Sequence, residues 1–163
     1  VQVADPKASF ILIDILKDNN ARAAEFGSHS ALVVNGHPEV AVKTGTSNDL
    51  RDNLTVGFTE KYLTAVWVGN NDSSPMSRVA SGITGAAPIW NEIMSKLLAK
   101  EPVANWQAPD GVIQLKCGGR TEWFIKGTEP GNYCGVLEDL KKQNEANPSP
   151  KPDILDSGAS TRR

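Results

Sequence analysis

The stretch VAVKTGTSNDLRDNLTVGFTEKYLTAVWVG, residues 40–69, decides the predicted fold, because two strands and a turn can be placed within it from the residue pattern. Apolar and polar residues alternate over 54–58, which is typical of a strand with one buried face. Thr59-Glu60-Lys61 can turn the chain, and residues 62–68 form an almost continuous apolar, β-rich run. Such a run predicts a central strand that is buried on both faces.

A hairpin is expected immediately upstream, in LVVNGHPEVAVKTGT, residues 32–46. The Asn35-Gly36 dipeptide within it favours a tight turn between two short strands. Residues 21–31 are expected to form a connecting loop. The sequence therefore predicts a partial antiparallel sheet of about four strands.

Two helices are expected to flank these strands. Asp5-Pro6 combines a capping side chain with a proline at the first helical position, so one helix is expected over 6–18. Apolar residues recur at i, i+4 and i+8 within 87–100, which predicts the other helix, and Pro102 follows its end. The fold class is therefore α+β. The expected core comprises Val56, Phe58, Val66, Trp67, Val68, Ile89, Ile93 and Leu97.

The composition changes beyond residue 100. Residues 101–146 are rich in proline, glycine and polar residues, with a possible short strand in EWFIKG and a turn or two of helix in LEDLKKQNEA. Residues 147–163 have the composition of a disordered tail. We therefore expect a domain portion over 1–100, a segment carrying two cysteines over 101–146, and a tail over 147–163.

Charge and hydropathy bear on which partners the chain could have. Seventeen basic and nineteen acidic residues give a net charge of −2, which gives no support for nucleic acid as a partner. No apolar run approaches membrane-spanning length. Because the chain begins at Val1, we expect a processed product or a fragment of a longer parent protein.

The two cysteines, Cys117 and Cys134, lie in one polar segment. Their spacing fits one loop-closing disulfide in an oxidising compartment, and the alternative is two unrelated free thiols. The histidines, His29 and His37, lack the companion spacing of a zinc site and are expected in loops. No metal or other cofactor is expected.

The polar end of the strand in AVKTGTS, residues 41–47, is the candidate site. Side chains alternate along a strand, so Thr44 and Thr46 share one face and Lys43 and Gly45 the other. Two hydroxyls can hold a carboxylate, and the lysine adds positive potential. A backbone N–H such as that of Thr46 can form half of an oxyanion hole at a cleft edge. The alternative is an ordinary polar strand end before a loop.

The wider context extends this motif to a family. Lys-Thr-Gly is one of the motifs of β-lactamases and penicillin-binding proteins. VAVKTGTSNDLRDNLTVGFT, then AVWVGNND and GAAPIWNEIM, resembles the C-terminal part of the transpeptidase domain of bifunctional (class A) penicillin-binding proteins. The resemblance covers about residues 3–100 in order, and EWFIKGTEPGNYC resembles the segment that follows this domain. It implies the back half of the serine β-lactamase and transpeptidase fold.

The resemblance also implies roles for the motif residues. Lys43 would lie under the active site, and Thr44 and Thr46 would contact the carboxylate of the stem peptide or of a β-lactam. The Thr46 N–H would contribute to the oxyanion hole, and Gly45 would keep the strand open to the cleft. The following loop, with Asn48, Asp49, Arg51 and Asp52, either touches substrate or is an ordinary loop with an Arg–Asp pair.

The nucleophile of this family is not found in the sequence. The chemistry needs a serine with a lysine three residues later and a middle motif of Ser-x-Asn type. No serine here has lysine at i+3 or asparagine at i+2. Both motifs precede the Lys-Thr-Gly strand by a long stretch in the family, so we expect that this chain never contained them. The parent would be a peptidoglycan transpeptidase with a serine acyl-enzyme and the isolated chain would be inactive.

Two other classes stay open, a serine β-lactamase-like hydrolase fragment and a non-catalytic interaction module. A β-lactamase normally ends soon after its last helix, whereas this chain continues for about sixty residues. The resemblance further implies an extracytoplasmic, membrane-anchored parent with a glycosyltransferase domain. Its expected partners are the stem peptide, β-lactam antibiotics and the rest of the transpeptidase domain.

Overall fold

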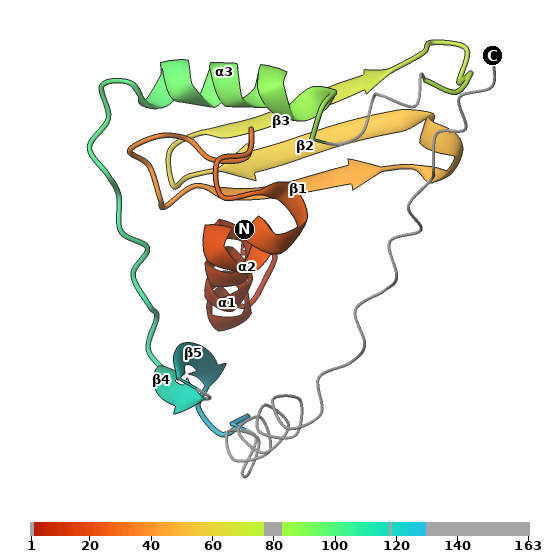
Figure 1. Ribbon diagram of the computed structural model, residues 1–163. Coiled ribbons are helices and arrows are strands. Elements are labelled where there is room, and N and C mark those ends of the chain that lie inside the picture. The colour runs from red at the N-terminus through yellow and green to blue at the C-terminus, as the bar shows by residue number, and fades with distance from the viewer. Residues whose placement is uncertain (1, 77–82, 118, 130–163) are drawn as a thin grey trace, which may run out of the picture. The chain divides into compact units, whose positions relative to one another are not determined.

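The computed structural model describes residues 2–76, 83–117 and 119–129. They form two compact units, one ending at Val112 and one beginning at Ile113. The first unit contains three α-helices and a three-stranded sheet (Figure 1). Its elements are α1 (Pro6–Lys17), α2 (Asn19–Phe26), β1 (Ala41–Thr46), the short 3-10 helix η1 (Asn48–Leu50), β2 (Asp52–Phe58), β3 (Leu63–Gly69) and α3 (Ala86–Leu98).

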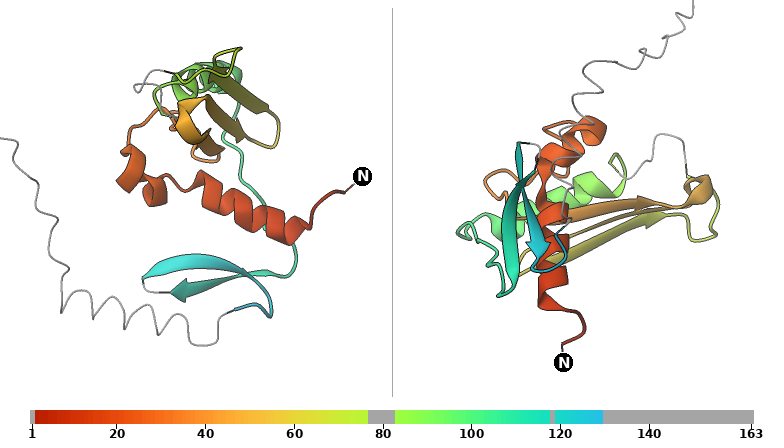
Figure 2. Two further views of the ribbon diagram at one scale, coloured as in Figure 1. Left: turned by 90° about the vertical axis from the view of Figure 1, so that its right-hand side faces the viewer. Right: turned by 90° about the horizontal axis from the view of Figure 1, so that it is seen from below.

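The sheet is antiparallel with the order β1-β2-β3, as two successive chain reversals require. Between β1 and β2, Ala41 pairs with Phe58 and Thr46 pairs with Asn53. Between β2 and β3, Asp52 pairs with Gly69. Helix α1 packs against β1, and α3 packs along β2 and β3. Two further views show the strands side by side with α3 along them (Figure 2). The predicted α+β class is confirmed.

Helix α1 begins where the sequence predicts. The Asp5 carboxylate accepts hydrogen bonds from the backbone N–H groups of Lys7 and Ala8, at 2.8 and 3.2 Å, and Pro6 occupies the first turn. Acceptance of these otherwise unpaired N–H groups stabilises the helix start. Asp18 ends α1, and its side chain accepts from the N–H of Ala21 at the start of α2. The expected loop over 21–31 is therefore wrong for its first half, because Asp18 starts a second helix.

The predicted hairpin over 32–46 is also wrong in its first strand. Residues 31–39 run through successive turns, and only Ala41–Thr46 forms a strand. Leu32, Val34 and Val40 are nevertheless buried in the core. Gly36 adopts a φ of +81°, which glycine tolerates, and it lies in a turn. This turn is not a hairpin turn, because no strand precedes it in this segment. Burial of these apolar residues explains why their pattern looks like a strand.

The core lies between α3 and one face of the sheet. It contains Trp90, Met94 and Leu98 of α3 together with Val42 of β1. The predicted helix over 87–100 is confirmed, but its predicted buried stripe is wrong. Ile89, Ile93 and Leu97 are exposed, with 48, 39 and 37% of their surface accessible. The stripe of Trp90, Met94 and Leu98 faces the sheet instead. Gly57 of β2 leaves room for the Trp90 ring, which fills the space that a side chain at this glycine would need.

Strand β3 is an edge strand among the described residues, not the central strand that its composition predicts. Its residues alternate between exposed and half-buried, and Trp67 exposes 50% of its surface. Val56, Phe58, Val66 and Val68 are only half-buried. The expected core is therefore wrong for Trp67 and only partly right for these four residues.

The segment after α3 stays with the first unit up to Val112. The indole N–H of Trp106 donates to the Glu39 carbonyl at 2.8 Å, and the Trp106 ring packs edge-on against Phe58. The Glu39 carboxylate is buried and accepts from the Ala104 N–H and from His37 Nδ1. These contacts tie the 101–112 segment to the sheet.

The second unit contains a two-stranded sheet of β4 (Val112–Cys117) and β5 (Arg120–Ile125). Strand β5 corresponds to the strand expected in EWFIKG, and β4 was not predicted. Cys117 is disulfide-bonded. Cys134, the expected helical turn in LEDLKKQNEA and the expected tail lie outside the described residues.

Candidate functional site

The outer edge of β1 carries the motif. Arg22 Nη1 donates to the Val42 carbonyl at 3.2 Å, so this carbonyl points away from β2. In an antiparallel pair, the N–H and C=O groups of every second residue point to the same side. The backbone groups of Thr44 and Thr46 therefore face the same outer edge, and the Lys43 ammonium reaches the Thr44 carbonyl there, at 2.5 Å. This is the edge at which a ligand could pair with β1.

The side chains of the motif divide between the two faces of the sheet, as strand alternation requires. Thr46 bonds to Asn53, whose side chain reaches the start of α3, so Thr44 and Thr46 lie on the α3 face. Lys43 and Gly45 lie on the opposite face. Lys43, Gly45 and Thr46 are exposed and Thr44 is half-buried. Two hydroxyls and one cation are thus presented around one strand edge.

Asn53 connects the motif to helix α3. The residue is completely buried and lies opposite Thr46 in the β1–β2 register. Its Oδ1 accepts from the Ala86 N–H at 2.7 Å, and its Nδ2 donates to Thr46 Oγ1 at 3.4 Å. Gly85, the residue before α3, supplies no side-chain cap, so the Asn53 amide satisfies a first-turn N–H of this helix.

The loop after β1 is tightly bonded. Ser47 and Asp52 exchange backbone and side-chain hydrogen bonds, with the Asp52 N–H donating to Ser47 Oγ at 2.7 Å. Asp49 and Leu50 have φ values of 60° and 55°, which are uncommon for residues with a side chain. Arg51 Nη1 donates to the Ser73 carbonyl at 2.7 Å, so two loops are held together beside the strand end. The ion pair between Arg51 and Asp49 is long, at 3.9 Å, and exposed.

A mainly apolar cavity of about 320 Å³ opens beside the motif. It lies between the α1–α2 corner and β1, and Lys43 and Thr44 form part of its wall. Apolar side chains from both helices line the rest, among them Ile15, Leu16 and Phe26. The strand edge therefore borders a hollow and not a fully packed surface.

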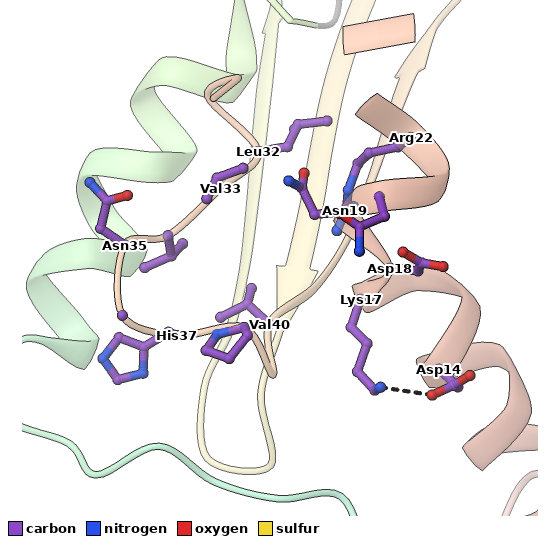
Figure 3. A pocket seen from close by; sticks show the side chains of 14 residues that line it. Asp14, Lys17, Asp18, Asn19, Arg22, Leu32, Val33, Asn35, His37 and Val40 are labelled. Atoms are coloured by element: carbon purple, nitrogen blue, oxygen red, sulfur yellow. Dashed lines mark ion pairs between the residues drawn. The ribbon is translucent and has the colours of Figure 1, made fainter. Parts of the chain in front are cut away.

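A larger and more polar cavity of about 480 Å³ lies near the start of β1 (Figure 3). Asp14, Lys17 and Arg22 reach it from the α1–α2 corner, and the 32–40 segment forms its other side. Lys17 is already paired with Asp14 at 2.7 Å. Burial lowers the pKa of the Arg22 guanidinium, and the nearby Asp18 opposes this shift. The motif residues Lys43 to Thr46 do not line this cavity.

The described part of the chain offers no metal centre, since it contains no group of three or more His, Cys, Asp or Glu side chains close enough to share an ion. His29 and His37 lie in irregular segments, and His37 is engaged with Glu39. Within the same residues, no helix has the length and apolar character needed to cross a bilayer.

Comparison with known proteins identifies the class. No family model matches the chain. Penicillin-binding protein 1A of Neisseria lactamica is 35% identical over 133 residues, which cover 80% of this chain and 16% of that protein. Penicillin-binding protein 1A of Pseudomonas aeruginosa is 30% identical over 166 residues, covering 97% of this chain and 20% of that protein.

The fold agrees with these similarities. A crystal structure of penicillin-binding protein 1A from Haemophilus influenzae superposes with a TM-score of 0.68 at 26% identity, covering 78% of this chain and 21% of that structure. The chain belongs to the penicillin-binding protein family and corresponds to a C-terminal part of its transpeptidase domain. It spans only 16–20% of the length of these curated relatives.

The structure brings the four predicted site residues, Lys43, Thr44, Gly45 and Thr46, onto one strand edge. Their roles stay predictions. Sequence reasoning missed Asn53 and Arg22, which bond to this strand from β2 and α2. Asparagine is disfavoured in strands, so its place directly before the alternating run over 54–58 was a signal that could have identified it.

Proposed function

We propose that residues 1–100 form the wall of a penicillin-binding transpeptidase site that binds the substrate carboxylate and stabilises the oxyanion. The observation that carries this proposal is the outer edge of β1, where the motif Lys43-Thr44-Gly45-Thr46 has its alternate backbone groups facing away from β2. Membership of the penicillin-binding protein family supports the reaction class. Residues 101–112 belong to the same compact unit as this wall.

The proposed reaction is acyl transfer in the complete protein. A serine outside this chain adds to the carbonyl carbon of the D-Ala-D-Ala amide, losing its proton to a base. The amide bond then breaks, the departing D-Ala amine gains a proton, and an acyl ester stays on the serine. An amine of a neighbouring stem peptide attacks this ester, which forms the cross-link and returns the serine. A β-lactam would be trapped at the ester stage.

Each motif residue has a proposed role in this reaction. Lys43 supplies positive potential beside the reacting serine, and the Thr44 and Thr46 hydroxyls bind the terminal carboxylate of the stem peptide or β-lactam. The Thr46 N–H stabilises the developing oxyanion, an effect that requires a donor placed before reaction. Gly45 leaves room for the ligand, since apart from its chain neighbours no described residue lies within 4 Å of the position that a Cβ would occupy there.

The proposed partners follow from this role. They are the peptidoglycan stem peptide, β-lactam antibiotics and the rest of the transpeptidase domain. We place the complete protein outside the cytoplasm, anchored to the membrane and joined to a glycosyltransferase domain. The isolated chain is proposed to be inactive, because it has no serine in either of the catalytic sequence contexts of the family.

Lys43→Ala in the complete protein tests the proposal. Removal of the cation should slow acylation by benzylpenicillin by about a hundredfold or more. Lys61→Ala is the matched control, because Lys61 is an exposed lysine that pairs with Glu101, and its loss should leave the rate unchanged. Stopped-flow measurement with a fluorescent penicillin gives both rates. A wild-type rate in Lys43→Ala would show that the motif has been misassigned.

A further inference from the structure

We propose that Asn53 is a positioning residue for Thr46 and turns its hydroxyl so that it donates to the carboxylate of the bound stem peptide or β-lactam. The inference rests on the proposed function of β1 and adds a residue that lies on another strand. Asn53 does not touch the ligand itself. It acts through Thr46, which lies directly opposite in the strand register.

The orientation of the Asn53 amide is determined by its partner on α3. The Ala86 backbone N–H can only donate a hydrogen bond, so the atom that meets it at 2.7 Å must be the amide oxygen. The NH₂ group of the same side chain then points to Thr46 Oγ1, at 3.4 Å. Because Asn53 is completely buried, solvent does not compete for either contact.

The direction of this second bond determines the role of the Thr46 oxygen. It accepts from Asn53, and a hydroxyl has only one hydrogen to donate. That hydrogen is therefore directed to an acceptor other than Asn53. A carboxylate offers only acceptor atoms at neutral pH. A Thr46 hydroxyl that is oriented to donate therefore matches the ligand carboxylate proposed for it.

The three groups form a relay in one direction, from the Ala86 N–H through Asn53 to Thr46. Successive hydrogen bonds of one direction polarise each other, which strengthens the last donor. The relay begins at the N-terminus of α3, a helix of 13 residues whose first-turn N–H groups carry partial positive charge. The start of α3 thus supports the motif on the sheet face that carries Thr46.

Asn53→Asp in the complete protein reverses this relay with little change in shape. The introduced carboxylate can still accept from Ala86, but it would also accept from Thr46 and turn the hydroxyl inward. We expect the dissociation constant of the non-covalent benzylpenicillin complex to rise about tenfold, since a hydrogen bond to a charged group is lost. The acylation rate constant from the bound complex should change little. The methyl ester of benzylpenicillin, which has no free carboxylate, should bind both proteins equally.

Two further variants separate positioning from charge and from general destabilisation. Asn53→Leu has no charge and no donor, so a rise in the dissociation constant there cannot come from repulsion of the ligand carboxylate. Asn91→Asp is the matched control, because Asn91 is an asparagine of α3 whose amide donates to the Ala31 and Val33 carbonyls away from the motif. The dissociation constant of benzylpenicillin should be the same for Asn91→Asp and the wild type. Thr46→Val combined with Asn53→Asp should weaken binding no more than Thr46→Val alone.

The outcomes separate the inference from the proposed function. Failure of benzylpenicillin to acylate the wild-type protein would contradict both. Normal acylation with an unchanged dissociation constant in Asn53→Asp and Asn53→Leu would overturn only the role of Asn53. If these variants do not fold, a crystal structure of the acylated wild-type protein decides. The inference requires the ligand carboxylate within hydrogen-bonding distance of Thr46 Oγ1 and an intact Asn53 bridge to Ala86, and a carboxylate bound elsewhere overturns it.

Discussion

Glycines of the sheet differ in whether they tolerate an added side chain, according to what packs against them. At Gly57 of β2, an added Cβ would overlap Cζ2 of Trp90 and lie 2.7 Å from its Cε2. Trp90 is completely buried, so the ring has nowhere to move without displacing the core. At Gly45 of β1, an added Cβ would meet nothing within 4 Å. The absence of a side chain therefore serves packing at Gly57, whereas the space beside Gly45 is open.

The first prediction follows from this difference. Gly57→Ala should lower the free energy of unfolding by about 1–3 kcal/mol, the usual cost of forcing extra volume into a packed core. Gly45→Ala should leave the free energy of unfolding nearly unchanged but weaken penicillin binding, because its methyl group narrows the space beside Lys43 on the same face of the strand. Thermal denaturation and penicillin titration of the complete protein measure the two effects. Equal destabilisation by both substitutions would contradict the packing described for Trp90.

At the scale of the elements, the start of α1 depends on a charged cap. Hydrogen bonds from the backbone N–H groups of Ala8 and Lys7 lower the pKa of the Asp5 carboxyl below its usual value of 3.8. A carboxyl whose pKa is lower in the folded state stabilises that state above its unfolded pKa. It loses this contribution as the pH falls through the folded pKa. The contribution of Asp5 to α1 is therefore present above pH 3.8 and lost below it.

The second prediction tests this cap. Asp5→Asn keeps a capping oxygen but does not titrate, so α1 should respond less to acid than in the wild type. Amide hydrogen exchange of residues 6–17, measured by mass spectrometry from about pH 5 to about pH 3, compares the two chains at each pH. Protection in α1 should fall more steeply with acid in the wild type. Parallel pH profiles would show that the Asp5 carboxylate does not stabilise the helix start.

The third prediction concerns the chain as a whole molecule, which should not be labelled covalently by a fluorescent penicillin. Acylation needs a serine activated by a nearby base. Ser47 follows the motif, but its hydroxyl accepts the Asp52 N–H and the Lys43 ammonium is bonded to the Thr44 carbonyl. The purified chain should show no fluorescent band after incubation and denaturing electrophoresis. A stoichiometric adduct on any serine would show that the chain does contain a nucleophile.

The fourth prediction concerns the pairing of Cys117 with Cys134. Closing a loop of this length stabilises a protein by about 3 kcal/mol when the bond is unstrained. Material from an oxidising compartment should therefore contain no alkylatable thiol before reduction and two after it. Mass spectrometry of the alkylated protein gives this count. Two alkylated cysteines without reduction would exclude the pairing.

Local patterns in the sequence were enough to locate most elements of the first unit. The helices predicted at 6–18 and 87–100 occur as Pro6–Lys17 and Ala86–Leu98, and two predicted strands occur as Asp52–Phe58 and Leu63–Gly69. Caps, turns and periodicity depend on neighbouring residues, so they can be read without the fold. The Lys-Thr-Gly motif and its surroundings were sufficient to identify the family.

Only the tertiary structure decided which apolar stripe of α3 is buried, that residues 31–39 turn instead of forming a strand, and that Asn53 supports Thr46. Each depends on residues far apart in the chain. The Trp90 ring fits because Gly57 lies beneath it, and Asn53 bonds to an N–H group 33 residues away. A periodic pattern shows that a helix has an apolar side, but the space available on the opposing sheet determines which side chains fill it.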